Sequence, residues 1–359
     1  MTARSPLLGP NAWRGDEIAD STRWLRHLSP RALAEIDAAL GACRVKGIPW
    51  RETTGEAFPL PGMAEDFADI RRELEDGCGM IKLRGLPVDR YSADELRQIW
   101  FGLGANLGHP VFQNRNGELM REIRDEGAEV GARYGQIHDG DAKGENSGPV
   151  FLSSYARTLS NGALRFHTDR CDVVGLLCVN QARAGGVSTL ASSVAVRNEI
   201  LRRRPDLLEV LYQKFYRSRF GEEETTPDAI YALPIFGDRD GKFTSHYSLT
   251  YIEVAQKVPS VPRLTAAQHE AIEMLMALAK DLSFEMRMEP GDIQLLNNHV
   301  VYHGRTPFED DDTLGQRRSL YRLWLAMPNS RALPEDHAVL WGQVAAGALR
   351  GGIGQARPS

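Results

Sequence analysis

The sequence has few of the features that mark secreted or membrane-spanning proteins. Four cysteines occur in 359 residues, and no two of them have the CxxC spacing of a zinc or redox motif. Disulfide-stabilised secreted domains use more cysteine than this. The chain has no apolar run of about 18 residues, the length that a membrane helix needs, and residues 1–17 show no apolar stretch behind a basic segment, as a secretory signal would. We therefore expect reduced thiols and a cytoplasmic location.

An excess of positive charge is also missing. The net charge is −5 and the pI is near 6.0, whereas general nucleic-acid binders and proteins of anionic membranes carry a basic surface. With 42% hydrophobic and 25% charged residues, the composition is that of an ordinary globular protein. We expect a small-molecule substrate as partner, with no nucleic acid and no membrane, and the composition leaves the oligomeric state open.

The secondary-structure pattern changes from helical to strand-like near residue 110. Ser29-Pro30 predicts a helix start, because serine is a good N-cap and proline fits the first helical position. The pair Ser92 and Glu95 has the spacing of a capping box and predicts another helix. Farther along, short apolar and β-branched segments between turns predict strands, among them 150–155 and 173–179.

This order of elements predicts an α+β protein with a mainly β core. We expect a double-stranded β-helix, or jelly roll, with surrounding helices and a helical N-terminal extension. The expected parts are the extension at 1–110, the jelly-roll core with inserted helices at 111–332, and a peripheral helix and tail at 333–359, forming one structural domain overall. The polar, glycine-containing segment 139–148 lacks the final glutamate of a calcium-binding loop and is interpreted as an ordinary loop.

A candidate metal site begins with His167 and Asp169, which are two residues apart. In an extended strand such residues point to the same face, so both side chains can meet at one point. A distant histidine would complete the set of two histidines and one carboxylate that binds Fe(II) in non-haem oxygenases. The strand-like segment Val300-Val301-Tyr302 places His299 and His303 on one face, and on spacing alone either histidine fits.

Two arginines follow on the last predicted strand. Arg318, Leu320, Arg322 and Trp324 alternate and therefore share one face. If that face is the barrel interior, two guanidinium groups enter an apolar core, which is costly unless an anion meets them. A dicarboxylate such as 2-oxoglutarate fits, because its 2-oxo acid end chelates iron and its far carboxylate can pair with Arg318 in a bidentate manner.

Several of these motifs occur together over about residues 150–326. As a set they resemble the taurine-dioxygenase-like and clavaminate-synthase-like (TauD/TfdA) family of Fe(II)/2-oxoglutarate oxygenases. The motifs are Phe166-His167-Thr168-Asp169, the turn Gly185-Gly186, Pro290-Gly291-Asp292 before Asn297-Asn298, and His303-Gly304-Arg305-Thr306-Pro307-Phe308 leading to Arg318 and Arg322.

The resemblance implies a role for each motif residue. It makes His303, and not His299, the third metal ligand, and it makes Arg318 the clamp for the far carboxylate of 2-oxoglutarate. Arg322 would then lie near the metal-side carboxylate of the cosubstrate or near the substrate. A hydroxyl just after the Gly-Gly turn assists the clamp in this family, and Ser188 and Thr189 both stand there. Beyond the metal ligands, no further catalytic residue is expected.

The resemblance also implies the reaction. The enzyme would use Fe(II), 2-oxoglutarate and O2, release succinate and CO2, and oxidise an unactivated C–H bond. Because Asp169 is a carboxylate, no halide position is left, and hydroxylation, desaturation or ring formation is favoured over halogenation. Family members act on small carboxylates, sulfonates and amino acids, so we expect a small carboxylate or amino-acid-like substrate. The expected pocket residues are Arg322, Gln113, Asn114, Arg124 and Arg165.

Three other functions fit parts of this pattern. A protein or peptide hydroxylase would use the same fold with an open groove, and the acidic loop Glu309–Asp312 offers a surface for a basic peptide. A non-catalytic jelly-roll binding protein would have kept the fold alone, although the complete ligand set His167, Asp169 and His303 argues against it. A zinc hydrolase would use the same three ligands but gives no reason for inward-facing arginines.

Overall fold

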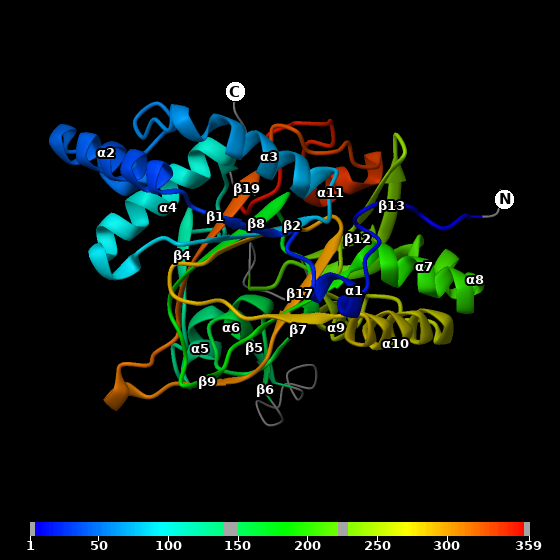
Figure 1. Cartoon of the computed structure of the whole chain (residues 1–359). Coiled ribbons are helices and arrows are strands. Elements are labelled where there is room, and N and C mark those ends of the chain that lie inside the picture. The colour runs from blue at the N-terminus through cyan, green and yellow to red at the C-terminus, as the bar shows by residue number, and fades with distance from the viewer. Residues whose placement is uncertain (1–3, 139–149, 222–228, 355–359) are drawn as a thin grey trace.

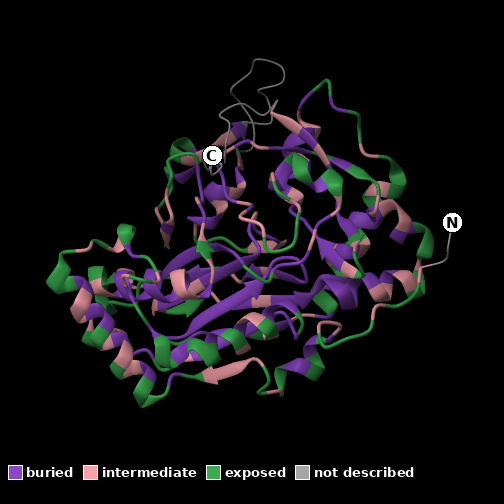
Figure 2. Cartoon of the chain, turned by 90° about the horizontal axis from the view of Figure 1, so that it is seen from above, coloured by how far each residue is buried: buried purple, intermediate pink, exposed green. Residues whose placement is uncertain are grey.

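The computed structural model describes residues 4–138, 150–221 and 229–354. Two β-sheets face each other at its centre, and helices lie outside both of them (Figure 1). The segment interpreted as a loop at 139–148 lies outside the described residues. Figure 2 shows buried residues concentrated in the central strands and exposed residues on the outer helix faces and turns, so the core lies between and around the sheets.

The larger sheet has seven strands in the order β1-β2-β16-β8-β19-β3, with β4 also paired to β19. All its neighbouring strands are antiparallel except β1 and β2. The strands are β1 (Leu25–His27), β2 (Met80–Arg84), β16 (Ile293–Asn297), β8 (Val173–Asn180), β19 (Ser319–Ala326), β3 (His109–Pro110) and β4 (Met120–Ile123). Strands β1 and β2 come from the N-terminal third of the chain, so this part also contributes to the sheet.

The smaller sheet has four strands in the order β15-β10-β17-β7. They are β15 (Phe284–Met286), β10 (Ser188–Ser192), β17 (Val301–Arg305) and β7 (Leu164–His167). Strand β17 pairs with β10 through five consecutive residue pairs and with β7 on its other side. Two facing sheets of this kind are the double-stranded β-helix that the sequence predicts, and the expected fold class is confirmed.

Three helices cover the outer face of the larger sheet. They are α2 (Pro30–Lys46), α3 (Ala64–Glu75) and α4 (Ala93–Leu107), which lie together in Figure 1. The Ser29 and Ser92 side chains cap α2 and α4 as predicted. Trp100 of α4 donates from its indole nitrogen to the Tyr321 carbonyl of β19 at 2.9 Å. A Cβ atom on Gly175 would lie 2.7 Å from the Trp100 ring, so glycine in β8 is what permits this packing.

A second group of helices packs beside the smaller sheet. It consists of α7 (Ser193–Arg203), α8 (Pro205–Leu211) and α10 (Ala266–Asp281). Their apolar faces share one buried cluster with β10, β15 and β17. Both helix groups place their apolar faces on a sheet, so the two faces that meet between the sheets are left for the functional site.

The remaining elements are short and border the two sheets. The helices are α1 (Gly15–Ala19), α5 (Val130–Tyr134), α6 (Ser154–Thr158), α9 (Leu249–Gln256) and α11 (Ala338–Trp341). The strand pairs are β5 (Gln136–His138) with β6 (Val150–Leu152), β9 (Ala184–Gly185) with β18 (Phe308–Glu309), β11 (Lys214–Ser218) with β12 (Ile230–Pro234), and β13 (Phe236–Arg239) with β14 (Lys242–Ser245).

One strand prediction is wrong in its second half. The strand predicted at 150–155 ends at Leu152, because the Ser153 side chain caps the following helix α6 by accepting from the Ala156 N–H at 3.1 Å. The three-part division at residues 110 and 332 stays a prediction. No helix among the described residues combines the length and the apolar character that crossing a membrane requires.

Candidate metal centre

The smaller sheet brings His167, Asp169 and His303 together. His167 ends β7, His303 lies in the middle of β17, and the two residues are direct partners in the strand register. Their rings are 4.3 Å apart between centroids. Asp169 follows in the turn after β7, and one ligand atom from each of the three residues lies within 4.8 Å of the other two. Strand pairing therefore gathers three candidate ligands from two distant segments.

Hydrogen bonds hold the Asp169 carboxylate in place. The Asp169 backbone N–H donates to Asn298 Oδ1 at 2.9 Å, and the Trp324 indole N–H donates to Asp169 Oδ2 at 2.9 Å. Arg322 Nη1 lies 3.9 Å from the same oxygen. Burial alone would raise the Asp169 pKa, but Arg322 and the two histidines outweigh it, and the pKa stays below its usual value. With Oδ2 engaged in this way, Oδ1 is left for a metal.

Both histidines place a ring nitrogen near the Asp169 carboxylate. His167 Nδ1 is 2.9 Å from the Arg165 carbonyl, an arrangement that keeps the proton on Nδ1 and turns the Nε2 lone pair toward Asp169. Burial and the neighbouring His167 lower the His303 pKa to about 3, so its imidazole is uncharged. Each Nε2 atom lies 3.8 Å from an Asp169 oxygen. Two imidazoles and one carboxylate are a ligand set that suits Fe(II), so the residues present fit this metal.

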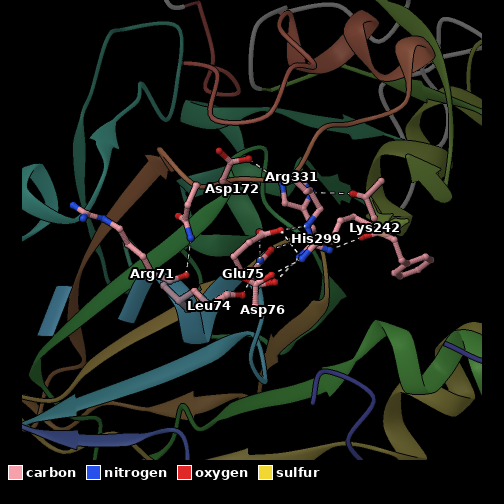
Figure 3. Close-up of polar contacts among 12 residues, drawn as sticks. Arg71, Leu74, Glu75, Asp76, Asp172, Lys242, His299 and Arg331 are labelled. Carbon is pink, nitrogen blue, oxygen red and sulfur yellow. Dashed lines mark hydrogen bonds and ion pairs between the residues drawn. The ribbon is translucent and has the colours of Figure 1, made fainter. Parts of the chain in front are cut away.

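His299, the alternative on spacing, is occupied elsewhere. Its Nδ1 is 2.8 Å from Thr244 Oγ1, and its Nε2 is 2.9 Å from Asp172 Oδ1. Arg350 also donates to Asp172 Oδ1, at 2.8 Å. Figure 3 shows His299 and Asp172 within this buried polar network. His299 therefore stabilises the fold behind the three candidate ligands and does not join them.

A cavity beside the three candidate ligands contains a buried arginine that forms no ion pair with any described residue. Arg318 and Arg322 line it together with Ser188, Gln294 and other residues of both sheets. Arg318 is 5% exposed, and its Nη1 atom has no hydrogen-bond partner among the described residues. Burial lowers the Arg318 pKa to about 10. A buried cation of this kind is costly unless an anion binds it, so the cavity suits a ligand with an anionic group.

The Gly-Gly turn and Ser188 complete this wall. Gly186 has φ +70°, and a Cβ atom there would lie 2.9 Å from Arg318 Cδ, so glycine allows the arginine side chain to pass. Ser188 lines the cavity, and its Oγ is 3.5 Å from Gln294 Oε1. Thr189 points to the other side of β10, where its Oγ1 would meet a Cβ on Gly304 at 2.8 Å. Of the two candidate hydroxyls, Ser188 is the one beside Arg318.

Two of the expected pocket residues make internal contacts. Gln113 accepts from Arg322 Nε at 2.6 Å and donates to the Arg322 carbonyl at 2.8 Å, so it fixes the side chain that lines the cavity. Asn114 donates to Glu118 and to the Tyr155 hydroxyl. Both residues are buried and act through their neighbours.

Arg322 lines the cavity, and the remaining two expected pocket residues lie at the surface or beside it. Arg124 is 4.0 Å from Glu122 and about half exposed. Arg165 forms a two-point ion pair with Glu253 and lines a cavity next to His167.

Several functional contacts carry no local sequence signal. The Trp324 to Asp169 hydrogen bond joins residues 155 positions apart. Arg305 is buried and donates to the carbonyls of Ser160 and Gly162, and burial together with Arg318 lowers its pKa to about 9. Strand alternation predicts that Arg318 and Arg322 face the interior, and it places Trp324 on the same face. This alternation is the one sequence signal for the contact between Trp324 and the Asp169 carboxylate.

The fold and the three clustered donors define a mononuclear non-haem iron oxygenase. Residues 44–324 match the model of the taurine catabolism dioxygenase TauD, TfdA family. The chain belongs to this family and is an Fe(II)- and 2-oxoglutarate-dependent dioxygenase.

Two relatives cover most of the chain. FR-33289 synthase of Streptomyces rubellomurinus is 28% identical over 352 residues, which are 96% of this chain and 97% of that protein. The taurine hydroxylase-like protein SAT17 of Stachybotrys chartarum is 30% identical over 319 residues, which are 87% of this chain and 77% of that protein.

Solved structures share the fold at lower identity. Asparagine oxygenase in complex with Fe(II), hydroxyasparagine and succinate has a TM-score of 0.62 and 17% identity, over 91% of this chain and 100% of that one. The non-haem iron oxygenase OrfP in complex with Fe and α-ketoglutaric acid has a TM-score of 0.59 and 16% identity, over 90% and 99%. At these identities the likeness establishes the jelly-roll fold.

Proposed function

We propose that this enzyme hydroxylates an unactivated C–H bond of a small carboxylate or amino acid, with His167, Asp169 and His303 as the Fe(II) ligands. The observation that carries the proposal is that these three donors meet beside the buried guanidinium of Arg318, whose Nη1 has no partner among the described residues. A zinc hydrolase would have the three ligands but no use for such a cation. A dicarboxylate cosubstrate needs both features.

Three residues that line the cavity have a proposed task. Arg318 binds the far carboxylate of 2-oxoglutarate through its planar fork, and Ser188 beside it donates from its hydroxyl. Arg322, fixed by Gln113, lies near the metal-side carboxylate of the cosubstrate or near the substrate. When bound, iron supplies the activation of O2 that is coupled to decarboxylation of 2-oxoglutarate to succinate and CO2. The apolar walls around the arginines exclude water.

Two neighbours support an amino-acid substrate. Asparagine oxygenase is solved with hydroxyasparagine and succinate, and OrfP is solved with hydroxyarginine and succinate. A peptide hydroxylase gains little support, because Glu309 of the acidic loop pairs with Arg183. A binding protein without activity would not need three intact ligands. We also propose a cytoplasmic location, which fits four buried cysteines without a disulfide.

The proposal is tested by adding Fe(II) and then 2-oxoglutarate to metal-free protein without oxygen. The chelate of iron by 2-oxoglutarate gives a visible charge-transfer band, and we expect this band in the wild-type protein. Asp169→Ala should lose it, because one metal ligand is removed. Iron binding without the band would contradict the proposed cosubstrate site. A panel of amino acids is then screened for succinate formation above the substrate-free rate, and no stimulation by any of them would contradict the substrate class.

A further inference from the structure

A second cavity lies on the other side of His167. It is enclosed by α6, β7 and the start of α9, and its lining includes Arg157, Arg165, His167 and Thr250. Thr158, Leu164 and His167 also line the cavity with Arg318. The two cavities therefore meet at a candidate iron ligand, one on the cosubstrate side and one toward α6 and α9.

Arg165 connects this second cavity to the metal centre. Its carbonyl oxygen receives the His167 Nδ1 hydrogen bond, so its backbone orients the ligand. Its guanidinium donates to both Glu253 oxygens, at 2.9 and 2.6 Å, and to Thr250 Oγ1 at 3.1 Å. Arg165 and Glu253 are each about one third exposed, so the pair lies at the rim of the cavity.

Arg157 supplies a second positive charge that no described carboxylate pairs with. Its Nε donates to the Leu152 carbonyl at 3.1 Å, and its guanidinium lies 4.7 Å from the Phe151 ring centre. Burial and the neighbouring Arg165 both lower the Arg157 pKa, while Glu253 opposes them. Among the residues that the structure describes, two arginines thus face one carboxylate around this cavity.

We propose that Arg157 and Arg165 bind an oxyanionic group of the substrate, a carboxylate, sulfonate or phosphonate, in the cavity beside His167. This inference rests on the proposed function and names the part of the substrate that is recognised. The anion balances the surplus charge, and two guanidinium groups give it several charge-assisted hydrogen bonds. Glu253 holds Arg165 in position from the other side.

The test uses the anaerobic enzyme with Fe(II) and 2-oxoglutarate, and substrate binding is measured as a shift of its charge-transfer band. The probes are L-asparagine, taurine and 2-aminoethylphosphonate, and the counterparts without the oxyanion are the α-amide of L-asparagine and ethanolamine. We expect at least one oxyanionic probe to shift the band and its counterpart without the oxyanion to leave it unchanged. Equal shifts from the counterparts without the oxyanion, or no shift from any oxyanionic probe, would overturn the proposal.

Variants then locate the binding site. Arg157→Gln should raise the half-saturating concentration of the active probe by roughly 10- to 100-fold, as expected for loss of a charge-assisted contact. Arg157→Lys, which keeps the charge, should recover part of it. Glu253→Gln is the matched control: the glutamine keeps one oxygen that accepts from Arg165 and removes the opposing charge, so the half-saturating concentration should be equal or lower. An unchanged value in Arg157→Gln refutes the assignment.

The proposed function is judged by a different signal in the same samples. The charge-transfer band before any probe is added depends on iron and 2-oxoglutarate alone, so its presence in wild type and in Arg157→Gln shows that the metal centre is intact. A normal band with no oxyanion effect contradicts the second cavity as a binding site and leaves the proposed function standing. A missing band in wild type contradicts both.

Discussion

Replacing Arg318 by methionine separates its binding role from any role in stability. The side chain is 5% exposed and has no described ion-pair partner, so the folded protein bears the cost of a buried cation before 2-oxoglutarate binds. Methionine has a similar length and no charge. We expect Arg318→Met without ligands to be as stable as wild type or more stable, because replacing a buried charge by an apolar group is often neutral or favourable.

The affinity of Arg318→Met for 2-oxoglutarate should be lower than that of wild type. The carboxylate loses a two-point contact with a guanidinium, which we value at about 3 kcal/mol, and this is on the order of a 100-fold weaker affinity. A ligand at about 100 times its dissociation constant stabilises the folded state by about 2.7 kcal/mol. At the same concentration the variant should lose most of that stabilisation.

Arg331 provides a matched control among the buried arginines. It is 4% exposed, its Nε lies 3.0 Å from Glu75 Oε1, and Figure 3 shows the two side chains in the network with Lys242. Arg331→Met removes the closest cation from a buried carboxylate. We expect a loss of about 3 kcal/mol in the free energy of unfolding, or roughly 4 °C in Tm, and no direct effect on the binding of 2-oxoglutarate.

Thermal unfolding with and without 2-oxoglutarate, in the presence of Fe(II) and without oxygen, measures both effects. Arg318→Met should keep its Tm and lose the ligand-induced rise, whereas Arg331→Met should lose Tm and keep the rise. If Arg318→Met binds 2-oxoglutarate within about threefold of wild type, or loses as much Tm as Arg331→Met, the assigned role of Arg318 is wrong.

Three further substitutions test the surroundings of the site. Trp324→Phe removes the N–H donor to Asp169 Oδ2 and should weaken Fe(II) binding by roughly 10- to 100-fold in a metal titration; unchanged affinity would speak against the contact. Gly186→Ala places a Cβ atom 2.9 Å from Arg318 Cδ at a residue with φ +70°, so the half-saturating concentration of 2-oxoglutarate should rise while that of Fe(II) does not. The same half-saturating concentration of 2-oxoglutarate in the variant and in wild type would show that the arginine is not displaced. Burial lowers the His299 pKa from 6.5 to about 4, so between these pH values the unfolded chain binds a proton that the folded chain does not. His299 should therefore cost on the order of 3 kcal/mol of stability as the pH falls through this window. Urea unfolding at pH 6.5 and at pH 4 should show a smaller loss of stability for His299→Gln than for wild type, and an identical loss would contradict this.

Local sequence signals predict the candidate ligands, but they do not decide between His299 and His303. His167 and Asp169 are close in sequence, so strand geometry alone brings them together. His299 and His303 have equal spacing from a strand-like segment, and alternation cannot distinguish them. In the structure β17 begins at Val301, so His299 lies in the turn before the strand, where the alternation no longer applies. Strand boundaries are what local patterns predict least well.

The internal contacts of the polar residues were beyond local prediction. Gln113 and Arg322 are 209 positions apart, and Arg165 and Glu253 are 88 apart. Such contacts are created by the pairing of the sheets and the packing of α9, so no periodicity in the sequence reports them. For the same reason, the sequence indicates that Arg318 points inward but not that its Nη1 lacks a partner.

A structure of the anaerobic enzyme with Fe(II) and 2-oxoglutarate tests the central claim most directly. The account predicts iron at roughly 2.0–2.2 Å from His167, Asp169 and His303, with the far carboxylate of 2-oxoglutarate on Arg318. Iron on any other set of residues, or the far carboxylate on Arg305 or Arg322 in place of Arg318, would contradict it.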